Sequence, residues 1–144
     1  MTECTCTRCI ECCKHNPGWM TPEEAAAAID AGHSGRLMLD WLEPCDELKN
    51  KKRIYILAPA SIGHEGSNAP EMPSFDLTWS KGRCTFLKNN RCEIHNSGFK
   101  PLQCRESLAC NPSRSIGYLN NYAIAPLWKT GEAKSIVKRW KSLL

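Results

Sequence analysis

The chain opens on a dense cysteine motif, Cys6-Thr7-Arg8-Cys9-Ile10-Glu11-Cys12-Cys13. A gap of two residues lets neighbouring thiolates turn toward one ion while backbone amides point at the sulfur atoms, which suits both tetrahedral zinc and iron–sulfur clusters. Three cysteines at this repeat cannot all pair with one another as disulfides. Cys13 directly follows Cys12, so it points elsewhere and could serve a second ion. The motif predicts that this N-terminal segment binds metal.

Four more cysteines complete a set of eight: Cys84, Cys92, Cys104 and Cys110. Pro101 stands three residues before Cys104 and Arg105 follows it, a pattern that predicts a tight turn presenting the thiolate. Eight sulfur atoms suffice for two four-coordinate sites or for one polynuclear centre. We therefore predict this set of metal ligands: Cys6, Cys9, Cys12, Cys13, Cys84, Cys92, Cys104 and Cys110.

Two cysteines and two histidines remain outside the predicted ligand set. Cys45 follows a predicted helix end and is expected to be a buried, apolar-like residue. Cys4 could be a substitute ligand or a free terminal thiol. His15 and His95 lie near the cysteines in sequence and either could bind metal. We expect them to face solvent or to support the ligands, because the sulfur atoms already suffice.

The number of cysteines, ten in 144 residues, is the unusual feature of the composition. In a secreted chain this density would indicate a disulfide framework, whereas in a reducing compartment it indicates metal ligation. The first residues have neither a basic start nor an apolar stretch, so we expect no secretory signal and a cytoplasmic location. No apolar run reaches about 18 residues, so we expect no membrane span.

The formal charge of +4 raises the question of a nucleic-acid partner. Eight thiolates holding two divalent ions would bring that charge to zero, so the excess of lysine and arginine can offset an anionic metal centre. The basic stretches are also short, which argues against a nucleic-acid-binding surface. We expect a metal ion as the main partner and keep a protein partner as an option.

The residues after the first motif predict two helices. Residues 21–31 form the first, because Thr21 can cap it, Pro22 suits its first position and Gly32 can end it. Residues 34–42 predict a second helix, which begins at a serine that can cap it.

The rest of the chain predicts strands, a loop and one more helix. Residues 54–57 predict a buried strand, and residues 58–78, rich in proline, predict a long irregular loop. Residues 82–95 predict a hairpin with Cys84 and Cys92 on facing arms. Residues 131–144 predict an amphipathic helix, because apolar side chains recur there at spacings of three and four.

Together these elements predict one domain over residues 1–144, since the length fits a single domain. We expect a small α+β, cysteine-rich, metal-bound domain with helices around a short hairpin and an amphipathic C-terminal helix. Its cluster segments are residues 4–15 and 84–110.

Four segments, taken in order, resemble a known family. Residues 6–13, 84–87, 92–95 and 100–105 read CTRCIECC, CTFL, CEIH and KPLQCR. The pattern is similar to the CxxCxxCC, or YkgJ-type, cysteine cluster family, which is described as a zinc- or iron-chelating domain. The resemblance implies metal ligands at Cys6, Cys9, Cys12, Cys13, Cys84, Cys92 and Cys104, with Cys110 as a weaker match. The family usually has an aromatic residue at position 95 and arginine at position 100, and these departures leave the thiols intact.

Three functions fit these residues. The first is a zinc- or iron-binding module, structural or metal-handling, with no chemistry of its own. The second is a redox protein or metalloenzyme with an iron–sulfur centre such as a 4Fe-4S cluster. The third is a nucleic-acid or protein adaptor held together by zinc. A similar cluster accompanies methyl transfer in the bacterial flagellin lysine methylase, but this sequence shows no methyl-donor-binding domain. No catalytic residue can be assigned.

Overall fold

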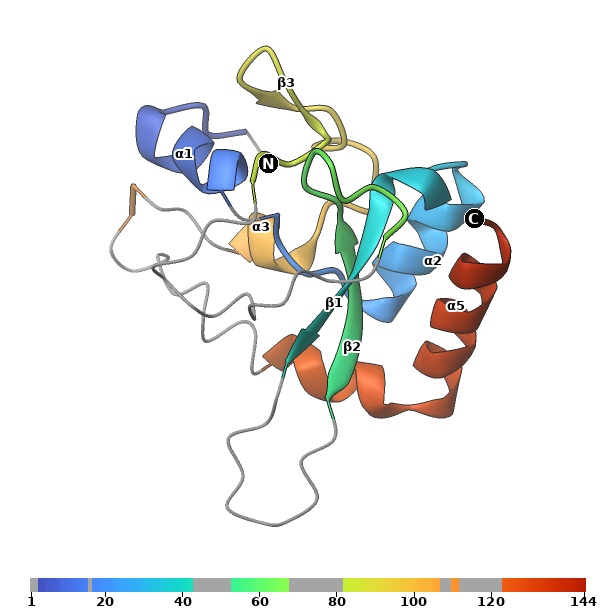
Figure 1. The fold of residues 1–144 in the computed structure, drawn as a ribbon. Coiled ribbons are helices and arrows are strands. Elements are labelled where there is room, and N and C mark those ends of the chain that lie inside the picture. The colour runs from blue at the N-terminus through green and yellow to red at the C-terminus, as the bar shows by residue number, and fades with distance from the viewer. Residues whose placement is uncertain (1–2, 16, 43–52, 68–81, 107–109, 112–122) are drawn as a thin grey trace.

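A computed structural model of the chain describes residues 3–15, 17–42, 53–67, 82–106, 110–111 and 123–144 (Figure 1). Its elements follow in the order α1 (Thr7–His15), α2 (Pro22–Asp30), the 3-10 helix η1 (Ser34–Arg36), β1 (Leu37–Leu42), β2 (Ile54–Pro59), β3 (Leu87–Lys88), β4 (Arg91–Cys92), α3 (Leu102–Glu106), the 3-10 helix η2 (Ala125–Lys129) and α5 (Gly131–Ser142). Helices and short antiparallel hairpins confirm the predicted α+β class. That one domain spans the whole chain stays a prediction.

The strands β1 and β2 form the central antiparallel ribbon, with Leu37 opposite Pro59 and Leu42 opposite Ile54. The helix predicted over residues 34–42 is therefore wrong beyond its first turn. Residues 37–41 are all buried and are apolar except for Asp40, and so short a buried run cannot be assigned to helix or strand by its periodicity alone. Pairing with β2 satisfies the backbone hydrogen bonds of a segment that is buried on both faces.

The strand predicted at residues 54–57 is confirmed and extends to Pro59. The first two residues of the loop predicted over 58–78 thus belong to β2. Residues 60–67 form turns, and Ser61 makes an isolated antiparallel bridge with Cys84. The remainder of the predicted loop, residues 68–78, lies outside the described residues.

The helix predicted after Thr21 is confirmed as α2, and its start is a capping box. Thr21 Oγ1 accepts a hydrogen bond from the Glu24 amide at 3.2 Å, and Glu24 Oε1 accepts one from the Thr21 amide at 2.9 Å. Pro22 takes the first helical position, and Gly32 follows the helix with a φ of +87°, which a glycine adopts without strain. The helix packs against α5 and β2.

The hydrophobic core lies between the ribbon, α2, η2 and α5. Its largest members include Trp19, Trp128 and Trp140, each no more than 3% exposed. The Trp19 indole donates a hydrogen bond to the buried carboxylate of Asp40 at 2.8 Å. The Trp128 indole donates to the carbonyl of Met20 at 2.8 Å. These bonds anchor residues 19 and 20, which directly precede α2 and follow the N-terminal cysteine segment.

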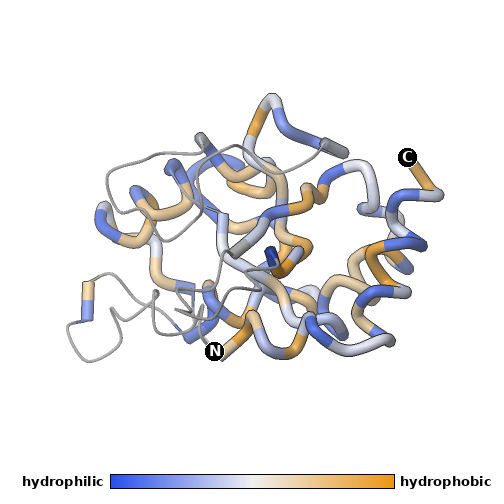
Figure 2. The backbone as a smooth tube through the Cα atoms, turned by 60° about the horizontal axis from the view of Figure 1, so that its bottom comes forward, coloured by the Kyte–Doolittle hydropathy of each residue, from blue (hydrophilic) through white to orange (hydrophobic). Residues whose placement is uncertain are grey.

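The C-terminal helix predicted over about 131–144 is confirmed as α5, which ends at Ser142. Ala133 and Trp140 are buried, whereas Leu144, expected on the same face, is 57% exposed because it lies beyond the helix end. In Figure 2 this helix carries both hydrophobic and hydrophilic bands. Among the described helices, none is long and apolar enough to cross a membrane.

The second hairpin, β3–β4, confirms the hairpin predicted within residues 82–95. Leu87 pairs with Cys92 and Lys88 with Arg91. The turn between them is Asn89-Asn90, with φ of +51° and +60°, as a two-residue hairpin turn of type I′ requires. Cys84 lies outside the paired arms, where it bridges Ser61 instead. The hairpin lies beside α1 in Figure 1, away from α5.

Candidate metal centre

The N-terminal cysteine motif folds as a helix, α1, which begins directly after Cys6. The first backbone bond of this helix runs from the amide of Ile10 to the carbonyl of Cys6 at 3.0 Å. Residues separated by three, four or seven positions lie on one side of a helix. The thiols of Cys6, Cys9 and Cys13 therefore form one stripe along α1, and Cys12 lies about 100° around the helix from Cys13. The CxxCxxCC spacing is a helical spacing, and it distributes its thiols along the axis.

Four thiols meet at the first end of this stripe, and we call them the exposed thiol group: Cys4, Cys6, Cys9 and Cys110. Their sulfur atoms all lie within 4.8 Å of one another. The Sγ atoms of Cys4 and Cys110 are 3.6 Å apart, and those of Cys9 and Cys110 are 3.7 Å apart. Cys110 is exposed and none of the four is buried, so the group is open to solvent.

The spacing of the exposed thiol group fits a single tetrahedral ion. Zinc–thiolate bonds of about 2.3 Å place the sulfur atoms of a tetrahedral site about 3.8 Å apart. The two separations measured to Cys110, 3.6 and 3.7 Å, match this value. Mononuclear iron accepts the same four-thiolate geometry. The residues present therefore suit a zinc or iron ion.

The protonation of the exposed thiol group is uneven. A hydrogen bond from the backbone amide of Cys9 lowers the pKa of the Cys6 thiol to about 7, as expected for a thiol at a helix N-terminus. Hydrogen bonds with the other three sulfur atoms of the group raise the pKa of Cys110 to about 12. Near neutral pH, Cys6 of the metal-free group is thus partly ionised, whereas Cys110 keeps its proton.

Four further cysteines lie toward the other end of α1, and we call them the inner thiol group: Cys13, Cys84, Cys92 and Cys104. The amide of Cys84 donates a hydrogen bond to the carbonyl of Cys13 at 2.8 Å. Burial raises the pKa of Cys104 well above its usual value, and charges at the other three thiols raise it further. These charge effects place the four cysteines in one neighbourhood. Among the described residues, however, only the exposed thiol group brings three or more potential ligand atoms within 4.8 Å of one another.

Burial dominates the electrostatics of the inner thiol group. It raises the pKa of Cys13 to about 11 and that of Cys84 to about 12. Burial also raises the pKa of Cys92. Neutral thiols tolerate such a site, whereas a cluster of thiolates needs a cation within it. The inner thiol group is therefore suited to a bound metal when its thiols are ionised.

Lys100 supplies a positive charge beside the inner thiol group. Its ammonium lowers the pKa values of Cys13, Cys92 and Cys104 against the larger effect of burial. The Lys100 Nζ atom lies 2.8 Å from Nδ1 of His95. Lys100 thus lies near these thiols, and the candidate ligand His95 contacts this lysine.

The N-terminus is also tied to the inner thiol group. The amide of Cys92 donates a hydrogen bond to the carboxylate of Glu3 at 2.5 Å. Glu3 directly precedes Cys4, a member of the exposed thiol group. Because α1 also carries members of both groups, the two groups are connected through this helix and through the hydrogen bond from Cys92 to Glu3.

Among the other candidate residues, Cys12 and His15 are not members of either group. Cys12 is exposed, and desolvation together with charges at Cys9 and Cys6 raises its pKa. His15 Nε2 lies 3.2 Å from a carboxylate oxygen of Glu11. Cys45 lies outside the described residues. The nine described cysteines are all free of disulfides.

Comparison with known families agrees with this geometry. The model of the CxxCxxCC family, described as "Putative zinc- or iron-chelating domain", matches residues 5–122. The chain belongs to the CxxCxxCC family. This confirms the predicted resemblance and supports metal binding through cysteine, without choosing between zinc and iron. No curated protein and no solved structure matches the chain.

The structure adds Cys4 to the thiols that family membership suggests. The family match begins at residue 5, so it does not cover Cys4, which sequence analysis left open as a substitute ligand. Cys110 lies with the N-terminal thiols and not with the inner thiol group. The spacing Cys4-x-Cys6 is the one sequence signal that could have indicated this, because it places a third thiol beside the helix start.

Gly18 gives the inner thiol group a close approach that only glycine allows. A Cβ atom at residue 18 would lie 2.4 Å from the Sγ atom of Cys104, whereas one at Gly35 would meet nothing within 4 Å. We expect Gly18→Ala to displace Cys104 and to weaken metal binding by about 10–100-fold, the range for disturbed ligand support. Gly35→Ala should leave it unchanged. Competition with a chromophoric chelator measures both, and equal affinities would contradict the assignment.

Proposed function

We propose that the chain is a metal-binding module with two thiolate centres and no chemistry of its own. A single zinc or iron ion occupies the exposed thiol group, and a second centre occupies the inner thiol group. The observation that carries this proposal is the convergence of Cys4, Cys6, Cys9 and Cys110 within 4.8 Å. Their ligand atoms come from residues 106 positions apart in the chain, so an ion there would cross-link the fold.

The compactness of the exposed thiol group supports one ion over a polynuclear cluster. In a 4Fe-4S cluster each cysteine binds a different iron atom, which places the thiolates around a core larger than one ion. Sulfur atoms 3.6 and 3.7 Å apart fit the edge of a single tetrahedron. A closed four-thiolate site is also typical of structural zinc.

The contrast in environment supports different roles for the two centres. The exposed thiol group contacts solvent, and the amide of Cys9 keeps Cys6 partly ionised near neutral pH. The inner thiol group includes Cys104 of α3 and is partly buried, and burial favours its protonated thiols. An ion at the exposed group should exchange with solution faster than one at the inner group. The proposal requires reduced thiols, in agreement with the expected cytoplasmic location.

Metal analysis of anaerobically prepared protein tests the proposal. We expect two metal ions per chain with sulfur coordination, and X-ray absorption of a Cys104→Ser variant should show one tetrahedral site without metal–metal scattering. This variant retains the exposed thiol group, which isolates its signal. Inorganic sulfide together with broad absorption near about 400 nm in the same variant would assign an iron–sulfur cluster there and overturn the single-ion proposal.

A further inference from the structure

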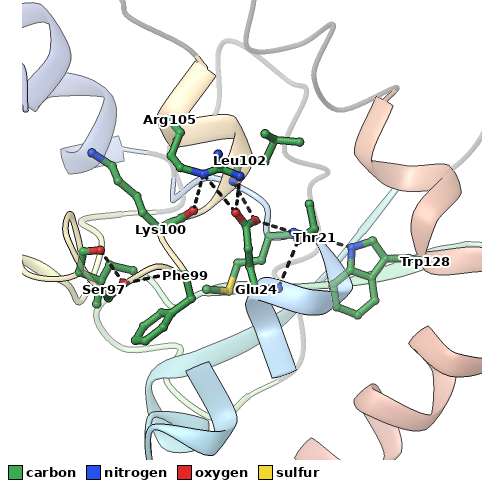
Figure 3. Close-up of polar contacts among 10 residues, drawn as sticks. Thr21, Glu24, Ser97, Phe99, Lys100, Leu102, Arg105 and Trp128 are labelled. Atoms are coloured by element: carbon green, nitrogen blue, oxygen red, sulfur yellow. Dashed lines mark hydrogen bonds and ion pairs between the residues drawn. The ribbon is translucent and has the colours of Figure 1, made fainter. Parts of the chain in front are cut away.

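The carboxylate of Glu24 joins two helices whose contact residues are 78 positions apart. Its Oε1 atom accepts hydrogen bonds from the amides of Thr21 and Leu102, both at 2.9 Å. Its Oε2 atom accepts from Nε and Nη2 of Arg105, at 3.2 and 2.6 Å. Figure 3 shows these bonds converging on Glu24 from the start of α2 and from α3.

These contacts exceed what α2 itself requires. A capping box is complete when the glutamate accepts from the amide of the cap residue, here Thr21. The other three bonds run to Leu102 and Arg105, the first residue of α3 and a residue of its last turn. Glu24 therefore holds both ends of the segment that carries Cys104.

The Glu24 carboxylate is buried, so its charge must be satisfied by hydrogen-bond donors around it. The Glu24 side chain is 8% exposed, and that of Arg105 is 41% exposed. A buried carboxylate is tolerated when charged and amide donors satisfy it, as four do here. Removing its charge would weaken all four bonds together, because each is made to an ionised acceptor.

The residues before α2 also contact α3. The amide of Trp19 donates a hydrogen bond to Oε1 of Gln103 at 2.8 Å. Gly18 leaves room for the Cys104 sulfur, which a Cβ atom there would approach to 2.4 Å. Residues 18–24 thus fix α3 through Gln103, Cys104 and the Glu24 carboxylate, and the core tryptophan at position 19 anchors them.

We propose that Glu24 is a positioning residue for Cys104, and that its bonds to α3 set the affinity of the inner thiol group for metal. The inference rests on the proposed function, since it takes the inner thiol group to be a metal centre. Metal–sulfur bonds tolerate errors of about 0.2 Å, so α3 must be placed before the ion arrives. If the bonds from Glu24 to α3 are lost, metal binding must also order α3, and the affinity of the inner thiol group falls.

The test is a Co²⁺ titration of the full chain in competition with a chelator. Cys104→Ser identifies the binding constant and the thiolate-to-cobalt absorption that belong to the inner thiol group. We expect Glu24→Gln to weaken that constant by about 10–100-fold, the range for groups that support metal ligands. The exposed thiol group should change by less than about threefold. Arg105→Lys keeps a positive charge but loses the two-pronged contact, so it should weaken the same constant in the same direction.

Thr21→Ala is the matched control, because Thr21 caps α2 but makes no bond to α3. It should lower the melting temperature by a few degrees, as loss of a helix cap does, and leave both constants and the cobalt spectrum unchanged. If Thr21→Ala weakens the inner constant as much as Glu24→Gln, Glu24 acts only through stability. An unchanged inner constant in Glu24→Gln, or in Arg105→Lys should Glu24→Gln not fold, also overturns the proposal.

The outcomes separate the two levels of inference. If the wild-type chain takes up no cobalt that Cys104→Ser removes, the inner centre of the proposed function fails, and the role of Glu24 fails with it. If the wild type binds two ions and the Glu24 and Arg105 variants bind both equally well, only the role of Glu24 is lost.

Discussion

Replacement of Cys9 by serine should remove one metal ion per chain and leave the other in place. Cys9 contacts Cys110 through sulfur atoms 3.7 Å apart within the exposed thiol group. A serine hydroxyl is a poor substitute for thiolate toward zinc or iron. We expect the affinity of this group to fall by more than about 100-fold, beyond the loss caused by disturbing a supporting residue. Elemental analysis after gel filtration and chelator competition measure the effect.

Cys12→Ser is the matched control for this experiment. Cys12 lies on the same helix, one turn further along, and is exposed. Its sulfur lies outside the four that meet within 4.8 Å. The metal content and both affinities should therefore stay within about threefold of the wild type, which is a small change beside the loss expected for a ligand.

Cys4→Ser tests whether the ligands are those predicted from the spacing of the motif or those that the structure brings together. The spacing of the motif predicts Cys12 as a ligand and leaves Cys4 open, whereas the structure places Cys4 in the exposed thiol group. We expect Cys4→Ser to resemble Cys9→Ser. Loss of the ion in Cys12→Ser but not in Cys4→Ser would show that the motif alone supplies the ligands.

The cysteine motif predicts a metal centre, but its residues do not determine how the thiols divide. Spacings of three and four residues fit a helix and also fit a turn around one ion. In the structure Ile10 is the buried residue of α1, so tertiary packing contributes to how this helix is oriented and which thiols meet. Such packing depends on residues distant in sequence, so local spacing could not reveal it.

The strand β1 shows that local sequence is also an incomplete guide to the fold. Leu37 and Met38 followed by Trp41 and Leu42 suit one face of a helix, but residues 37–41 are buried on both faces against β2 and its surroundings. Tertiary pairing overrides a local pattern here. By contrast, Thr21 with Glu24 and the turn Asn89-Asn90 were predictable, because caps and tight turns are made by neighbours in sequence.

Acid should release metal from both thiol groups, more steeply from the inner one. Metal binds thiolates, so every protonated thiol must lose its proton on binding. Burial raises the pKa of Cys13 to about 11 and of Cys84 to about 12, so the inner group is fully protonated near neutral pH without metal. Its affinity should rise by about four powers of ten per pH unit between about pH 6 and 8, one for each proton released.

The exposed thiol group should respond less steeply above neutral pH. The amide of Cys9 lowers the pKa of Cys6 to about 7, so this thiol is largely ionised by pH 8. Binding there should release about one proton fewer than at the inner group, and the two dependences should become equal only in acid. Chelator competition across this range measures the slopes, and proton release into a weakly buffered indicator measures the stoichiometry. Equal slopes at pH 8 would contradict the assigned role of Cys6.

The metal-free and metal-loaded proteins should differ in the sign of their stability change with pH. In the metal-free chain the partly buried thiols of Cys84 and Cys104 have pKa values raised above those of the unfolded chain. The stability that comes from keeping them protonated is complete below about pH 8.5 and is lost as pH rises toward about 12.

In the metal-loaded chain, protons compete with the ion, so stability is lost as pH falls. The melting temperature of the metal-free protein should therefore fall between about pH 8.5 and pH 10, whereas that of the loaded protein should rise from pH 6 until binding saturates. Parallel curves would mean that the inner thiols do not hold the metal, since only ligation reverses which protonation state the fold prefers.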